Sequence, residues 1–309
     1  MTPTTIILFY KYTHVVDPQS WADAARNLAQ QLHLKGRLLV AHEGVNGTFE
    51  GTPDEVEVFV KWMQEQPQFA DVDFKRSEGT GDAFPKLAVK VRNEIVGWRL
   101  GEDDVNPQEM TGKYITAEEL HAWIHSDKEF YIVDMRNDYE HAVGFFKNSV
   151  LPPLQNSRDL PSILPQLEHL RGKTIVTVCT GGVRCEKASG FLIKKGFADV
   201  YQLYNGIVTY MEKYPNEDFL GQLYVFDGRI TMGFNVADPA HVVVGKCGWC
   251  GNATENYIDC AYLHCREKRH FLCCEPCVAK EGGFCTEICR GKHERGEVPG
   301  GQEDQLQRL

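Results

Sequence analysis

The clearest chemical signal in the sequence is a cysteine at the end of a predicted buried strand. The apolar run Thr174–Val178 leads directly into Cys179, and a glycine-rich turn and a predicted helix follow it. In α/β sheets, ligands bind beyond the carboxyl ends of the strands, where this sulfur would lie. We expect the backbone N–H groups of the turn to curl around the sulfur, and the two glycines permit the backbone conformations that this requires. The residues expected to form this cradle are Thr180, Gly181, Gly182 and Val183.

Two features favour the thiolate form of Cys179. The N-terminus of the following helix and the fixed charge of Arg184 both stabilise a negative sulfur. A thiolate held in this way is a nucleophile, or it can carry a terminal sulfur as a persulfide. The alternative, a buried cysteine that only ends a strand, is disfavoured by the strand–CxxxxR–helix context. The next residue, Cys185, is open to two interpretations: a redox partner or second sulfur carrier, and a small core residue of the helix.

A second cluster of cysteines lies near the C-terminus. Nine of the eleven cysteines fall between Cys247 and Cys289, and they include two C-x2-C pairs. Such spacing is typical of structural zinc sites with four thiolate ligands, and eight thiolates would hold two ions. Reduced cysteines that pack a small module, or redox-active pairs, remain alternatives. Three histidines, His264, His270 and His293, are alternative ligands. The predicted ligand set, which leaves Cys273 spare, is Cys247, Cys250, Cys260, Cys265, Cys274, Cys277, Cys285 and Cys289.

Basic and aromatic side chains alternate in the same C-terminal segment. This combination can hold phosphates and stack unpaired bases, although nearby glutamates could make it an ordinary solvated surface. The predicted RNA contacts are Arg266, Lys268, Arg269 and Arg290. We expect a smaller contribution from Lys86, Lys90 and Arg92, because in an unbroken strand they share the face opposite to Leu87, Val89 and Val91.

The elements of the first hundred residues follow the order βαββαβ, which is the ferredoxin-like arrangement. Asp17-Pro18 and the capping box at Thr52 begin the two helices, and we expect Gly36 to end the first. Gly44–Gly47 is predicted as a turn. The predicted strands are Ile6–Tyr10, Leu38–Ala41, a return strand beginning at Thr48, Val72–Lys75 and Leu87–Val91.

The rest of the chain predicts a second and a third unit. Residues 101–112 are polar and contain proline and glycine, as linkers do. From a capping box at Thr116 onward, short buried strands alternate with helices, which predicts an α/β domain with a parallel sheet. We therefore expect an α+β domain at 1–100, a linker at 101–112, an α/β domain at 113–221 and a small Cys-rich module at 222–309. The last nine residues, from Gly301, are predicted to be a disordered tail.

The amino-acid composition and the charge of the chain exclude some classes of function. The chain has 309 residues, of which 42% are hydrophobic and 25% charged, as is ordinary for globular proteins. Its net charge is −10, and residues 101–244 alone carry −7, so a general nucleic-acid binder is excluded and any RNA contact must be local. No apolar run approaches the ~18 residues that span a bilayer, and no signal-peptide pattern is present. We therefore expect no membrane partner and a cytoplasmic location. We find no flavin, haem or nucleotide motif.

The loop at Cys179 resembles the catalytic loop of the rhodanese (sulfurtransferase) family. That loop has six residues and begins with a persulfide-forming cysteine, whereas the related phosphatases use one residue more. The segment Asp134-Met135-Arg136, followed by Glu140 and Gly144, is similar to the family's D-x-R…E…G segment. Many rhodaneses have histidine where this chain has Phe145. We expect Asp134 and Arg136 to form a structural ion pair that braces the loop.

Longer stretches resemble one subgroup, the bacterial tRNA uridine hydroxylase family. The resemblance runs in order over nearly the whole chain, and the family combines a ferredoxin-like (acylphosphatase-like) domain, a rhodanese domain and a cysteine-rich segment. It implies oxygen-dependent formation of 5-hydroxyuridine at wobble position 34, with O2 as co-substrate, the tRNA anticodon region as partner and Cys179 as active cysteine. No motif identifies an electron donor. The matching strings are CTGGVRCEKAS (Cys179–Ser189), GRLLVAHEGVNGTFEGT (Gly36–Thr52), MRNDYE (Met135–Glu140) and YQLYNGI (Tyr201–Ile207).

Two other functions compete with hydroxylation. The loop alone favours a sulfurtransferase that donates persulfide sulfur to tRNA or to a small thiol acceptor. The cysteine-rich segment alone favours a redox- or metal-responsive regulatory module.

Overall fold

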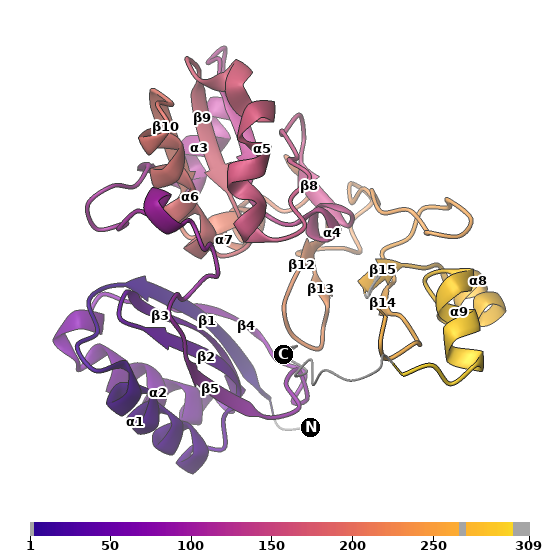
Figure 1. Cartoon of the computed structure of the whole chain (residues 1–309), viewed down its shortest axis with the longest axis horizontal. Helices are drawn as coiled ribbons and strands as arrows, with labels where there is room; N and C mark the ends of the chain where they lie inside the picture. The colour runs from indigo at the N-terminus through magenta and orange to yellow at the C-terminus, as the bar shows by residue number, and fades with distance from the viewer. Residues whose placement is uncertain (1–2, 266–269, 299–309) are drawn as a thin grey trace.

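The N-terminal domain is a five-stranded sheet with two helices against one face (Figure 1). The computed structural model describes residues 3–265 and 270–298. The sheet order β4-β1-β3-β2-β5 contains the predicted ferredoxin-like arrangement and adds β5, which runs parallel to β2. The elements are β1 (Thr5–Tyr12), α1 (Pro18–Gln31), β2 (Lys35–Ala41), β3 (Gly44–Gly51), α2 (Pro53–Gln64), a 3₁₀ turn (Pro67–Phe69), β4 (Lys75–Glu78) and β5 (Leu87–Val91).

Both predicted helix starts in this domain are confirmed. The Asp17 carboxylate accepts hydrogen bonds from the first amides of α1, and Thr52 forms a capping box with Glu55 at the start of α2. The apolar faces of the two helices pack on the sheet around buried aromatic rings such as Phe9 and Phe49. The opposite face of the sheet carries no helix and turns toward the rest of the chain (Figure 1).

Three local predictions in this domain are wrong. Helix α1 ends at Gln31 rather than near Gly36, because His33 already adopts a left-handed conformation with φ of 52°. Residues 44–47 belong to strand β3 and are not a turn. Gly44 is needed there because a Cβ would lie 1.9 Å from the Lys11 carbonyl oxygen. Strand β4 begins at Lys75, where the predicted strand ended, since only from there does the chain pair with β1.

The central domain contains the predicted parallel sheet, in the order β6-β10-β9-β7, with helices on both faces. Strands β8 and β11 form a separate antiparallel pair. The elements are β6 (Lys113–Ile115), α3 (Ala117–Ile124), β7 (Tyr131–Asp134), α4 (Asp138–His141), β8 (Gly144–Phe146), α5 (Leu160–Leu167), β9 (Thr174–Val178), α6 (Val183–Lys194), β10 (Asp199–Leu203), α7 (Gly206–Lys213) and β11 (Phe219–Gly221), with 3₁₀ turns at Ser157–Asp159 and Glu168–Leu170.

The segment between the two domains lies against the central domain. Trp98 is fully buried in the core beneath α6, together with Leu100. Beyond a 3₁₀ turn at Gly101–Asp103, the Gly112 amide donates to the Ser189 hydroxyl of α6 at 2.8 Å. The chain between the domains is therefore packed along α6.

The C-terminal part begins with a hairpin and continues into the Cys-rich module. The hairpin reaches back to the N-terminal domain, where the Gly228 amide donates to the Ala83 carbonyl at 2.7 Å. The predicted tail from Gly301 lies outside the described residues. Within residues 3–265 and 270–298, no helix is both long and apolar enough to cross a bilayer. The elements are β12 (Leu223–Tyr224), β13 (Thr231–Met232), β14 (Tyr257–Asp259), β15 (His270–Leu272), α8 (Glu275–Glu281) and α9 (Glu287–Glu294).

Candidate active site

Cys179 lies between the end of β9 and the start of α6, as the sequence pattern predicts. The Gly182 amide donates a hydrogen bond to its sulfur at 3.2 Å, and Gly182 adopts a φ of 101° to do so. The amides of Arg184 and Cys185 also face the sulfur and stabilise its negative form. The other predicted cradle residues serve the loop differently: Thr180 bonds through its hydroxyl, while Gly181 and Val183 pack against the N-terminal domain.

The surroundings of Cys179 favour the thiolate. Burial acts to raise the pKa of this thiol, but the Cys185 hydrogen bond and the Arg184 charge outweigh it and lower the pKa to about 6. Cys185 is also buried, and burial together with the neighbouring sulfur raises its own pKa. The pair therefore consists of a thiolate at Cys179 and a neutral thiol at Cys185 that donates to it. Neither sulfur is in a disulfide.

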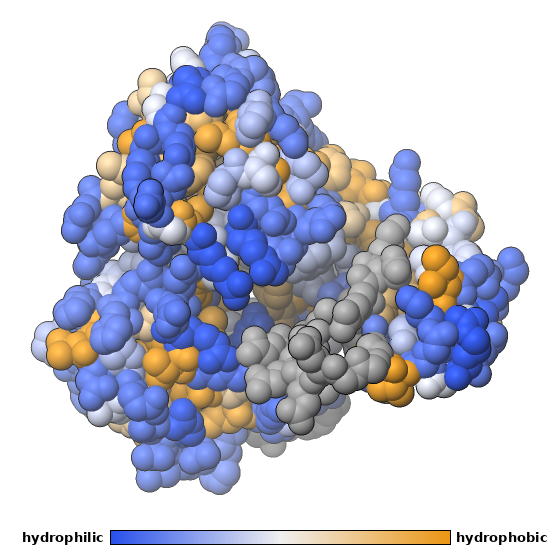
Figure 2. Space-filling view, viewed as in Figure 1, coloured by the Kyte–Doolittle hydropathy of each residue, from blue (hydrophilic) through white to orange (hydrophobic). Residues whose placement is uncertain are grey.

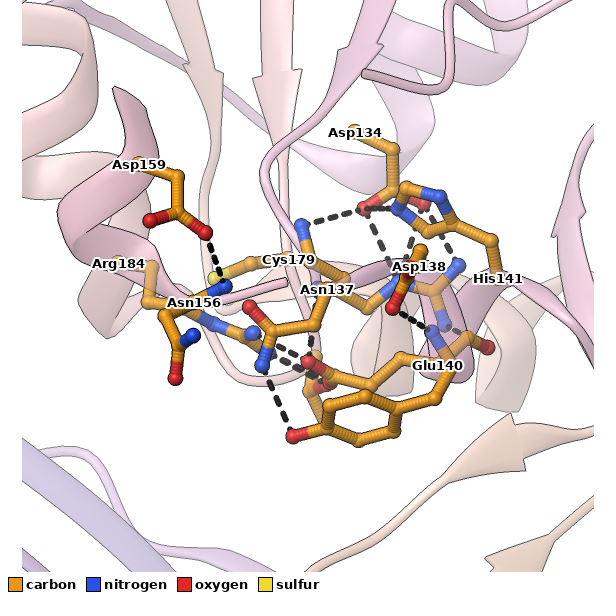
Figure 3. A network of polar contacts seen from close by, with 12 residues as sticks. Asp134, Asn137, Asp138, Glu140, His141, Asn156, Asp159, Cys179 and Arg184 are labelled. Atoms are coloured by element: carbon orange, nitrogen blue, oxygen red, sulfur yellow. Dashed lines mark hydrogen bonds and ion pairs between the residues drawn. The ribbon is translucent and has the colours of Figure 1, made fainter. Parts of the chain in front are cut away.

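Arg184 is held by the carboxylate of Glu140 in helix α4 (Figure 3). Its two terminal nitrogens donate to the Glu140 carboxylate at 2.5 and 2.8 Å, and one also donates to the Thr180 hydroxyl at 3.1 Å. Glu140 is fully buried, so this bidentate pair is shielded from solvent. Arg184 therefore acts on Cys179 as a charge that Glu140 and Thr180 hold in place.

Asp134 and Arg136 form a second buried ion pair behind the loop. The Arg136 Nη2 atom donates to the Asp134 carboxylate at 2.6 Å and to the Gly144 carbonyl at 2.8 Å. Burial acts to raise the pKa of Asp134, but the Arg136 charge and the neighbouring His141, whose Nε2 atom lies 3.6 Å from the carboxylate, hold it well below its usual range. The contacts join the end of β7 to β8.

Strand β1 of the N-terminal domain covers the loop directly. A Cβ at Gly181 would lie 2.7 Å from the Leu8 side chain, and one at Gly182 would lie 2.7 Å from the Tyr10 hydroxyl. The Tyr10 hydroxyl donates to Glu186 of α6 at 3.1 Å. The two loop glycines therefore permit a contact between domains that no larger residue would allow.

A cavity of about 440 Å³ lies between the helix-free face of the N-terminal sheet, the Cys179 loop and the β12–β13 hairpin. Cys179, Thr180 and Arg184 line one side of it, and residues of all five N-terminal strands line the other. Such a volume is within the usual range of small-molecule and cofactor sites. The active cysteine thus faces a chamber that three parts of the chain build together.

The eight cysteines predicted as metal ligands lie in two groups of four. Within each group the sulfur atoms are within 4.8 Å of one another. Several S–S separations are 3.5 to 3.6 Å, close to the about 3.8 Å edge of a tetrahedron whose Zn–S bonds are about 2.3 Å. Cys273 belongs to neither group. The groups are Cys247, Cys250, Cys274 and Cys277, and Cys260, Cys265, Cys285 and Cys289.

The predicted RNA contacts differ in where they lie and in whether their charges are compensated. Arg266, Lys268 and Arg269 fall in 266–269, outside the described residues. Arg290 donates to the Glu281 carboxylate and forms an ion pair with Glu287 at 3.1 Å, so its charge is compensated. Lys90 and Arg92 line the cavity, while Leu87, Val89 and Val91 pack toward the helices. The expected division is therefore present for Lys90 and Arg92, whereas Lys86 is exposed, lies before β5 and does not line the cavity.

Sequence reasoning missed several polar contacts. Glu140 was seen only as part of a motif, although it is the partner of Arg184. Glu186 accepts hydrogen bonds from Tyr10 and Tyr114, two tyrosines of different domains, which no local pattern could reveal. His121 of α3 and His125, the residue that follows α3, both contact the Asp218 carboxylate. Their helical spacing was the available signal, and together with Glu217 they form a group that could hold a metal ion.

Comparison with known proteins agrees with this architecture. Family models match as a UPF0176 acylphosphatase-like domain at residues 4–95, a rhodanese-like domain at 116–213 and a rhodanese C-terminal region at 220–290. A protein of Bacillus mycoides named tRNA uridine(34) hydroxylase is 42% identical over 93% of this chain and 89% of its own length. One of the same name from Cytophaga hutchinsonii is 39% identical over 96% of this chain and 92% of its own.

The chain belongs to the tRNA uridine(34) hydroxylase family. Among solved structures, a rhodanese-like domain protein from Staphylococcus aureus is 30% identical, covers 32% of this chain and 90% of that chain, and has a TM-score of 0.28. The three-part architecture expected for the hydroxylase family is confirmed.

The interaction between the two sulfurs predicts how the alkylation rate of Cys179 depends on pH. In the unaltered protein, alkylation of Cys179 should rise with a midpoint near pH 6, because the thiolate is the reactive form. Cys185→Ala removes the hydrogen-bond donor and should move this midpoint upward, toward the ordinary thiol value of about 8.5. Cys185→Ser keeps a donor and is the matched control. Mass spectrometry of the Cys179 peptide gives the rates, and an unchanged midpoint in Cys185→Ala would contradict this assignment.

Proposed function

We propose that this protein hydroxylates the wobble uridine, position 34, of tRNA to 5-hydroxyuridine with O2 as co-substrate, and that Cys179 is its reactive group. The observation that carries the proposal is the Cys179 thiolate at the wall of the cavity between the domains. The names of the curated relatives support the same reaction. The reduced cysteines and a tRNA substrate are consistent with a cytoplasmic location.

The cavity suits a single unpaired nucleotide. Sequence-specific RNA recognition mostly targets unpaired bases that can be splayed out of a loop, and the anticodon presents such bases. About 440 Å³ accommodates one nucleotide but not a duplex. Arg184 is held by Glu140 and Thr180, so in this proposal its main role is to stabilise the thiolate.

Hydroxylation places one oxygen atom of O2 on C5 of the base and reduces the other to water. Reduction of the second oxygen atom to water consumes two electrons and two protons, which an external donor supplies. The protein's own contribution is to exclude bulk water, hold the base, and present a thiolate whose negative form persists at neutral pH.

Persulfide transfer to tRNA or to a thiol acceptor is the alternative, since the same loop could carry a terminal sulfur. The names of the relatives do not favour it. The two functions leave different products in tRNA, so one measurement separates them.

We further propose that the two groups of four cysteines each hold a structural zinc ion. Four thiolates in a tetrahedral arrangement are the typical ligands of such sites. The donor set and the S–S separations of this module fit that geometry.

The proposed role of Cys179 predicts that tRNA loses 5-hydroxyuridine when this cysteine is replaced. In a strain lacking the gene, the unaltered protein should restore 5-hydroxyuridine and its derivatives, whereas Cys179→Ser should restore none, because a hydroxyl does not ionise near neutral pH. Nucleoside mass spectrometry of total tRNA measures the 5-hydroxyuridine that each protein restores. Cys273→Ser, which changes a cysteine outside both groups, is the matched control. Full modification by Cys179→Ser, or loss of a thiolated nucleoside instead, would contradict the proposal.

The zinc proposal predicts a stoichiometry of about two metal ions per chain by elemental analysis. Cys274→Ser should lower this to about one, since it removes a ligand from one group only. Cys273→Ser, at the adjacent position, should retain both ions. A metal-free protein whose cysteines all react in the folded state would exclude these sites.

A further inference from the structure

The two faces of the N-terminal sheet differ sharply in charge. Side chains alternate along a strand, so residues two apart share a face. On β2 and β5, Leu38 and Val89 point to the helices and are buried in the core. Arg37 and Lys90 have the opposite parity, and both line the cavity on the helix-free side. Because β2 pairs in parallel with β5, Arg37 opposite Ala88 and Leu39 opposite Lys90, the two cations lie near one another.

The cations of this face are not held in ion pairs, although Asp227 attracts Arg37 and Asp73 attracts Lys75 from a longer distance. Arg37, Lys75 and Lys90 line the cavity, and none forms an ion pair with residues 3–265 or 270–298. Arg92 also lines the cavity; its guanidinium donates to the carbonyl of its own neighbour, Val91, and forms no ion pair with the described residues. Arg37 lies over the ring of Phe226 at 5.4 Å. Burial lowers the pKa of Lys75 to about 8, against the opposing attraction of Asp73.

The other cations around the cavity are already paired. Arg76 contacts Glu57 at 2.8 Å, and Arg229 contacts Asp227 at 2.7 Å. Asp227 is the acidic side chain among the described lining residues, and Arg229 uses both of its oxygens. The four cations Arg37, Lys75, Lys90 and Arg92 therefore add positive charge to a chamber in a protein of net charge −10. Positive charge concentrated in a cleft with low-dielectric walls attracts anions.

Aromatic rings are present in the same chamber. Tyr10 and Phe226 both line it, and Lys75 lies 5.3 Å from the centre of the Tyr10 ring. Cations that follow a backbone, combined with rings on which bases stack, are the usual means of binding single-stranded nucleic acid. A duplex keeps its bases paired and would present only phosphates to this narrow space.

We propose that the helix-free face of the N-terminal sheet binds the phosphates of single-stranded RNA through Arg37, Lys75, Lys90 and Arg92. This inference rests on the proposed function, because the RNA is the one that carries the target uridine to Cys179. It places the main anchor outside the Cys-rich module, where Arg290 is compensated by Glu281 and Glu287 and the other predicted contacts lie outside the described residues.

The test uses charge reversal on strand β5. Lys90→Glu and Arg92→Glu, alone and together, change cations of the cavity, whereas Lys86→Glu makes the same change at an exposed residue of the same chain segment outside it. The probe is an unmodified synthetic anticodon stem-loop, with a blunt RNA duplex as comparison. Fluorescence anisotropy at several salt concentrations gives the Kd and its salt dependence.

We expect each cavity variant to weaken stem-loop binding several-fold and to lower the slope of log Kd against log salt by about one unit, while Lys86→Glu changes neither. Bound stem-loop should also protect Cys179 from alkylation. Retention of the alkylation midpoint near pH 6 in the free variants shows that the loop is intact. Unchanged Kd and slope in the double variant, or equally tight binding of the duplex, would overturn the inference.

The outcomes separate this inference from the proposed function. If tRNA contains no 5-hydroxyuridine that depends on Cys179, but the cavity variants still lose stem-loop binding, the proposed reaction is wrong and the binding face stands. If Cys179→Ser abolishes the modification while the double variant binds like the unaltered protein, the reaction stands and the binding face is elsewhere.

Discussion

The site depends on the close approach of strand β1 to the loop that holds Cys179. Gly181 and Gly182 have no side chains, and a Cβ at either would lie 2.7 Å from an atom of Leu8 or Tyr10. The same glycines let the loop turn so that the Gly182 amide points at the sulfur. One pair of residues therefore serves both the thiolate and the contact between domains. The cavity exists because this contact fixes the N-terminal sheet across from the cysteine.

Helix α6 connects the electrostatics of the site to the position of the domains. Its first turns carry Arg184, which pairs with Glu140, and Glu186, which accepts from Tyr10 of β1. Lys187 is almost fully buried and contacts Glu43 of the N-terminal domain at 2.7 Å. Removing one partner of such a buried pair leaves an uncompensated charge, which is more damaging than losing an exposed pair. Residues two or three apart on one helix thus control both the pKa of Cys179 and the shape of the cavity.

Local features were predictable from the sequence, and contacts between distant segments were not. Thr52 and Thr116 begin helices where the capping boxes predicted, and the eight cysteines gather as their spacing suggested. Gly44 was misread as part of a turn, because only the pairing of β1 with β3 reveals the backbone that it must approach. The cavity was missed for the same reason: Arg37 and Cys179 are far apart in sequence, and no pattern indicates that they line one chamber. The central domain's negative charge suggested an anchor in the tail, and only the folded structure shows that cations without ion pairs to the described residues lie opposite the active loop.

The central claim is that the target uridine enters the cavity between β1 and Cys179. It is tested most directly by a tRNA anticodon stem-loop that carries photoreactive 4-thiouridine at position 34, irradiated in complex with the full chain. Mass spectrometry of the digested adduct then identifies the attached peptides. The account predicts attachment to the cavity-lining peptides, those that contain Leu8 and Tyr10 or the loop from Cys179 to Arg184. Attachment confined to the Cys-rich module after residue 245 would contradict it.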